Sequence, residues 1–97
     1  MSNYQLGIDD ASGTITTGGT AQTILKDGAG CRQFLLIQNN ATETLWYNFG
    51  KTAVAGQPSL SIPAGAYQMW SLPGIVPQQF VSIIGATTGD AFTCKYA

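Results

Sequence analysis

The sequence predicts an all-β protein, an antiparallel β-sandwich or jelly-roll-like barrel of about seven short strands with an extended N-terminal arm. Short segments rich in apolar, β-branched and aromatic residues recur at intervals of about 8 to 12 residues, separated by residues typical of turns. No segment has the sustained 3.6-residue period of an amphipathic helix. The 97 residues are enough for one domain with a single core.

The first 19 residues predict an arm rather than a part of the core. They are rich in Gly, Ser and Thr, and their large apolar side chains are few: Tyr4, Leu6, Ile8 and Ile15. So little apolar surface hardly offsets the entropy lost on ordering, so the arm is expected to be mobile on its own. Two interpretations stay open, a frayed terminus or an arm that orders by docking on a neighbouring subunit. The expected division is an arm over 1–19 and a β-sandwich over 20–97.

The first strand of the domain is expected over 20–25, where β-branched residues precede a Gly-rich turn. The clearest predicted β-hairpin follows, over 31–50. Its first half contains the continuous apolar run 34–37, which indicates a central strand with apolar neighbours on both faces. Its second half places Leu45, Tyr47 and Phe49 on one face, and a polar loop of about five residues joins the two halves.

Four more strands complete the prediction. A short, half-exposed strand at 60–62 ends at a Pro-Ala-Gly turn, and an alternating strand at 66–71 carries bulky side chains on both faces. The apolar run 80–84 is the second strongly buried candidate. The last strand alternates over 91–96, which indicates one buried face.

Composition narrows the classes of partner. Charged residues make up 9% of the chain, the net charge is −1, and the four basic residues are scattered. A groove that binds phosphates needs clustered Lys and Arg, so no nucleic-acid partner is expected. No run of about 18 apolar residues is present and no secretory signal is visible, so neither a membrane span nor export is expected. A nearly neutral surface gives little protection against self-association, which suits a protein that lives in an assembly.

The residues present argue against an enzyme, a cofactor and a metal site. The chain has no His, which removes the usual general base and the commonest metal ligand. The five carboxylates fall in predicted loops or in the arm, where a solvated turn residue is the simplest interpretation, and Asp9 and Asp10 lack the spacing of a calcium loop. Cys31 and Cys94 are expected to be unlinked, buried thiols, with a disulfide between them as the alternative.

The aromatic residues allow two interpretations. Large rings with a polar edge serve either as core, or as an exposed platform for sugars or for a neighbouring subunit. Both interpretations apply to Trp46, Tyr47, Tyr67 and Trp70.

Four segments of the chain carry a resemblance to a known group. They read FLLIQN at 34–39, TLWYNFG at 44–50, SIPAG at 61–65 and VSIIGATTGDAFT at 81–93. Over about Gly30 to Thr93, the chain resembles small virion structural proteins of tailed bacteriophages and related modules of their tail and fibre proteins. Relatives often have Gly-Gly after the proline, where this chain has Ala64 and Gly65.

The resemblance implies a capsid cement or decoration protein. It also implies a homo-oligomer, which is expected to be a trimer. Such a protein binds the major capsid protein on the outside of the shell and stabilises it, after assembly in the cytoplasm of the bacterial host. The residues expected to contact neighbouring subunits or the capsid are Tyr4, Leu6, Ile8, Ile15, Tyr67 and Trp70. The alternative is a head-fibre or tail-tip module that recognises host glycans. The group has no catalytic residues to carry over.

Overall fold

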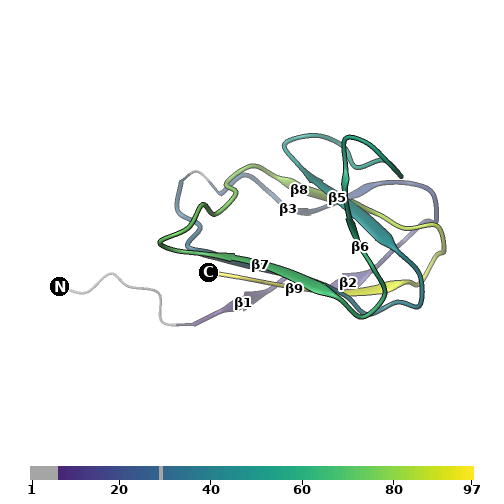
Figure 1. Cartoon of the computed structure of the whole chain (residues 1–97), viewed down its shortest axis with the longest axis horizontal. Helices are drawn as coiled ribbons and strands as arrows, with labels where there is room; N and C mark the ends of the chain where they lie inside the picture. The colour runs from purple at the N-terminus through teal and green to yellow at the C-terminus, as the bar shows by residue number, and fades with distance from the viewer. Residues whose placement is uncertain (1–6, 29) are drawn as a thin grey trace.

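The computed structural model describes residues 7–28 and 30–97, which form nine β-strands and no helix. The strands make two antiparallel sheets that face each other as a sandwich (Figure 1). The predicted all-β, antiparallel sandwich is therefore confirmed. No helix in the described part of the chain is long and apolar enough to cross a membrane.

Each sheet contains strands that are distant in the sequence. The five-stranded sheet has the order β1-β9-β4-β7, with β2 also paired to β9, and consists of β1 (Asp9–Asp10), β2 (Gly13–Thr14), β4 (Phe34–Asn39), β7 (Tyr67–Ser71) and β9 (Ala91–Tyr96). The four-stranded sheet has the order β3-β8-β5-β6 and consists of β3 (Gln22–Leu25), β5 (Leu45–Phe49), β6 (Leu60–Ile62) and β8 (Val81–Ile84). The seven expected strands are all present, and β1 and β2 are additional.

The predicted hairpin over 31–50 is wrong, because its two strands lie in different sheets. β4 lies between β9 and β7, whereas β5 lies between β8 and β6. The buried side chain of Asn39 organises the crossing: its amide nitrogen donates to the carbonyl oxygens of Glu43 at 2.7 Å and Ile62 at 2.8 Å. Its Oδ1 accepts from the backbone N–H of Ala41 at 2.8 Å. The polar loop therefore spans the two layers instead of closing a tight turn.

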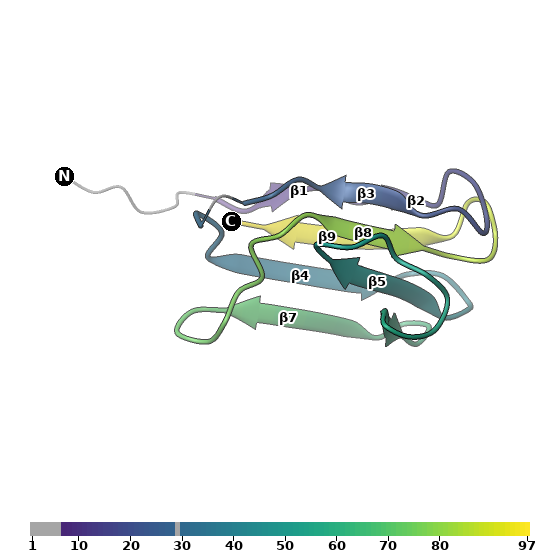
Figure 2. The same ribbon diagram turned by 90° about the horizontal axis from the view of Figure 1, so that it is seen from above.

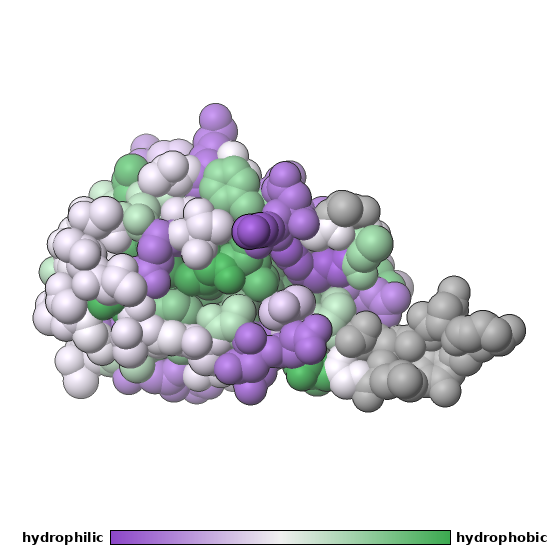
Figure 3. Space-filling view, turned by 180° about the vertical axis from the view of Figure 1, so that it is seen from behind, coloured by the Kyte–Doolittle hydropathy of each residue, from purple (hydrophilic) through white to green (hydrophobic). Residues whose placement is uncertain are grey.

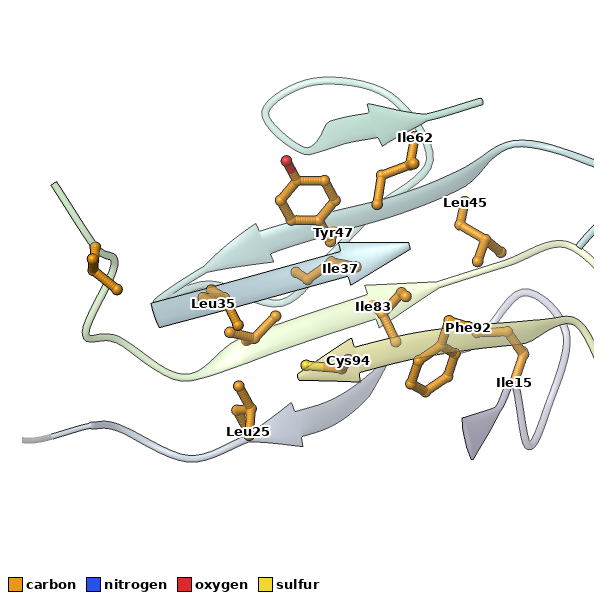
Figure 4. Packing of buried hydrophobic residues seen from close by; sticks show 12 residues of the cluster. Ile15, Leu25, Leu35, Ile37, Leu45, Tyr47, Ile62, Ile83, Phe92 and Cys94 are labelled. Atoms are coloured by element: carbon orange, nitrogen blue, oxygen red, sulfur yellow. The ribbon is translucent and has the colours of Figure 1, made fainter. Parts of the chain in front are cut away.

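The core fills the space between the sheets (Figure 4). Period-two alternation points one side of each strand inward, which is why Leu35 and Ile37 of β4 face Leu45 and Tyr47 of β5. The rest of the buried cluster is Ile15, Leu25, Ile62, Val76, Val81, Ile83, Phe92 and Cys94.

Part of the segment expected as an arm lies in the sandwich. β1 and β2 pair with β9, and Ile15 is fully buried. The backbone of Ile15 donates to the carbonyl of Asp90 and accepts from the N–H of Gly89, both at 2.8 Å. Backbone pairing with β9 therefore orders a segment whose few apolar residues had suggested a mobile arm. The boundary at residue 19 stays a prediction, and residues 1–6 lie outside the described part.

Candidate assembly surface

β7 is an edge strand, because it pairs with β4 on one side and with no described strand on the other. Figure 2 shows it along one border of the molecule. The N–H of Asn39 donates to the carbonyl of Ala66 at 2.9 Å, and the N–H of Leu72 donates to the carbonyl of Gln33. In an antiparallel ladder every second residue of a strand bonds to the same neighbouring strand. Since Ala66 and Leu72 bond to the β4 side, the backbone groups of Tyr67 and Met69 point away from β4.

Four large apolar side chains along this border are exposed. The exposed fractions are 60% for Tyr67, 52% for Met69, 60% for Leu72 and 88% for Ile75. Residues 67–75 contain no charge, and lysine is one of the devices that protect edge strands from pairing with other chains. We call residues 67–75 the β7 edge. It combines unpaired backbone groups with exposed apolar side chains.

The inner face of β7 is held by an aromatic cluster. The ring of Trp70 is half-buried and lies edge-on to Phe49 at 5.2 Å and to Tyr47 at 6.0 Å between centroids. Aromatic pairs in this geometry add to the stabilisation from burial. Trp70 therefore fixes the strand on the core, and its ring points inward rather than toward a ligand outside.

The expected contact residues are dispersed. Tyr67 and Trp70 share β7, whereas Ile8, 61% exposed, adjoins β1 at the opposite edge of the same sheet. Ile15 is buried in the core, and Tyr4 and Leu6 lie outside the described residues. Met69, Leu72 and Ile75 were missed, although Met69 alternates with Tyr67 and the other two flank a Pro-Gly break.

The two cysteines are in different environments and no disulfide joins them. Cys94 is buried, as expected, whereas the expectation that Cys31 is buried is wrong, because Cys31 is exposed. Burial raises the pKa of the Cys94 thiol to about 11, which keeps it protonated and unreactive at neutral pH.

The side of the molecule away from the β7 edge has an apolar hollow bordered by polar residues (Figure 3). A cavity of about 360 Å³ is lined by residues that include Asp9, Leu25, Arg32 and Tyr96. Arg32 is 7% exposed, and its guanidinium donates to three backbone carbonyls, those of Pro77 at 2.6 Å, Lys26 at 2.8 Å and Gln79 at 3.2 Å. Arg32 thus joins two loops, and its contacts indicate a structural role.

In the described part of the chain, the acidic and cysteine side chains do not gather into a metal centre. Within residues 7–28 and 30–97, no three His, Cys, Asp or Glu residues are placed to hold a metal ion together.

Comparisons with known proteins bear on the fold. No family model and no curated protein matches the chain. A solved structure of a Bacillus endospore appendage, from a family described as disulfide-linked pili, is similar with a TM-score of 0.57 and 17% identity over 99% of this chain and 90% of that one. At this identity the likeness shows the fold alone.

This finding corrects the expected function. The similar solved structure is a pilus protein, not a phage capsid protein, so neither the capsid cement role nor the fibre-tip alternative is retained. The segments that carried the phage resemblance are strands and turns of a β-sandwich, and this architecture occurs in proteins with unrelated functions. What holds is the coarser part of the expectation, a β-sandwich like that of a structural protein.

Proposed function

We propose that this chain is a structural subunit that assembles with copies of itself into a filamentous appendage. The observation that carries the proposal is the β7 edge, where unpaired backbone groups lie beside the exposed side chains of Tyr67, Met69, Leu72 and Ile75. The likeness of the fold to an endospore appendage protein supports the same class of assembly.

Strand addition explains how such an edge would bind. A strand from a second copy pairs its backbone with the outward groups of β7, while apolar side chains bury area beside it. The net charge of −1 gives little repulsion between copies. Burial of the four large apolar side chains exposed on the β7 edge would add a hydrophobic contribution to these hydrogen bonds.

A contact between unlike edges can repeat from copy to copy and so build a filament. The opposite edge of the same sheet is formed by β1 and β2, and Ile8 is exposed beside it. If β7 of one copy meets this edge of the next, the contact is head-to-tail and repeats without closing unless its rotation completes a circle. This homo-oligomer needs no catalytic group, no cofactor, no nucleic acid and no membrane.

We propose that this assembly is noncovalent, unlike the disulfide-linked pili of the similar structure. Cys31 and Cys94 are the two cysteines of the sequence, and Cys94 is buried. A head-to-tail contact joins different surfaces of the two copies, so it does not bring Cys31 of one copy to Cys31 of the next.

The experiment compares self-assembly of two lysine variants with that of the unmodified protein, by sedimentation velocity and electron microscopy over a range of concentrations. Met69→Lys places a charge on the β7 edge and is expected to keep the protein monomeric. Val54→Lys is the matched control, because Val54 is also apolar and exposed, at 41%, but lies in the loop between β5 and β6. The control and the unmodified protein are expected to form filaments.

Filaments of Met69→Lys indistinguishable from those of the unmodified protein would contradict the role of the β7 edge. An unmodified protein that stays monomeric at every concentration would contradict the proposed function itself.

A further inference from the structure

Two carboxyl groups meet at the end of the sandwich where β4 and β8 finish. Glu43 lies in the β4–β5 loop and Asp90 at the end of the β8–β9 loop, and their side chains are within hydrogen-bonding reach of each other. Glu43 Oε2 and Asp90 Oδ2 are buried, and neither has a hydrogen-bond donor among the described residues. Two ionised carboxylates in this position repel, whereas one proton held between them provides the missing donor.

No basic side chain relieves this repulsion. The groups that act on the pair are each other and Thr87, whose side chain hydrogen-bonds Glu43. Lys95 lies toward the far end of β9 and pairs with Asp10 at 3.1 Å. The remaining basic residues are also at the other end of the sandwich. Lys51 follows the end of β5, and Lys26 and Arg32 lie near the start of β8.

The pKa values of the two carboxyl groups shift in opposite directions. The hydrogen bond with Glu43, followed by burial, raises the pKa of Asp90. The hydrogen bonds with Asp90 and then Thr87 lower the pKa of Glu43. Between these two pKa values the pair holds one proton.

The loop that carries Asp90 also anchors the segment after β2. The N–H of Ile15 donates to the carbonyl of Asp90, and the N–H of Gly89 donates to the carbonyl of Ile15, both at 2.8 Å. The N–H of Gly19 donates to the carbonyl of Gly85 at 2.8 Å. These backbone hydrogen bonds connect the β8–β9 loop to residues 15–19, so a change in the loop would act on that segment through them.

We propose that Glu43 and Asp90 form a proton-operated latch, which joins the β4–β5 and β8–β9 loops while the two carboxyl groups share one proton and loosens as the pH rises. Stability due to the raised pKa of Asp90 is present at low pH and is lost as the pH rises through that pKa. Stability due to the lowered pKa of Glu43 is lost as the pH falls through its pKa. The latch is therefore strongest at pH values between the pKa of Glu43 and the pKa of Asp90. This inference does not depend on the proposed function.

The test measures hydrogen exchange of the Ile15 and Gly89 amides against pH, corrected for intrinsic exchange rates, in the full chain. In the unmodified protein, protection is expected to fall above the pKa of Asp90, and each tenfold of the fall corresponds to one pKa unit by which the fold raises that pKa. In Asp90→Asn the amide donates to Glu43 at every pH, so protection is expected not to fall. Asp9→Asn, which removes an exposed carboxyl, is expected to behave like the unmodified protein.

An equal fall in Asp90→Asn and in the unmodified protein would overturn the latch. A carbon-detected NMR titration of the unmodified protein decides the question even if that variant does not fold. The latch requires the signals of both carboxyl groups to respond to two shared steps, and independent titration at ordinary carboxyl pKa values would overturn it.

Discussion

Tyr47 combines a fully buried ring with a hydroxyl that has no hydrogen-bond partner among the described residues. The ring packs edge-on against Phe49 at 5.5 Å, and the oxygen points away from the labelled aliphatic residues (Figure 4). Burial raises the pKa of Tyr47 to about 12, so the hydroxyl stays neutral at physiological pH. The ring therefore contributes to the core, whereas the buried oxygen costs free energy.

Tyr47→Phe is expected not to lower the free energy of unfolding. It raises it by as much as about 3 kcal/mol if the buried hydroxyl bears the full cost of a polar group without a partner. Urea unfolding measures this change. Tyr67→Phe is the control, because the side chain of Tyr67 is exposed and its substitution should change stability little. A loss of more than about 1 kcal/mol in Tyr47→Phe would show that the hydroxyl has a stabilising partner.

At the scale of single residues, alternation in the sequence was a reliable guide to burial. It indicated the inner faces of β5 and β9 because side chains in a strand alternate between the two sides of the sheet. It did not indicate the contact between Glu43 and Asp90, which lie in loops that come together only in the folded chain. Composition likewise gave no signal that Cys31 is exposed, because a cysteine outside a disulfide is usually buried.

At the scale of elements, the sequence predicted strands better than it predicted their partners. The run 34–37 correctly indicated a central strand, because β4 lies between β9 and β7. The expectation of apolar neighbours on both faces was only partly met, because one face of β4 is buried and the other is half-buried. The expected pairing of β4 with β5 failed because a polar loop of this length can either turn within a sheet or cross between two sheets. The buried Asn39 side chain donates to the carbonyl of Glu43, just before β5, and to the carbonyl of Ile62 in β6. These hydrogen bonds stabilise the crossing.

The pairing of β1 and β2 with β9 makes a prediction about Ile15. Ile15→Ala is expected to lower the free energy of unfolding by about 2–5 kcal/mol, because it leaves a cavity in the core. Ile8→Ala is the matched control: Ile8 is 61% exposed, so its loss should stay within about 0.5 kcal/mol. Equal, small losses in both variants, measured by urea unfolding, would mean that the segment behaves as a loose arm.

At the scale of the whole molecule, the sequence predicted the architecture and gave the wrong function. Strand patterns and turn residues specify a sandwich because they record which side chains face the core. They contain little information about the assembly to which a sandwich belongs, because that depends on which edges and outer faces are left uncovered. The β7 edge became visible as a candidate surface only once the strand order placed Tyr67 and Met69 at a border.

The central claim, that the β7 edge pairs with a second copy, is tested most directly by hydrogen exchange of its amides in monomers and in assembled protein. The amides of Tyr67 and Met69 point away from β4 and should become protected on assembly. The amides of Gln68 and Trp70 face β4 and serve as internal controls whose protection is present in both states. Assembly that leaves the Tyr67 and Met69 amides as exposed as in the monomer would contradict the claim.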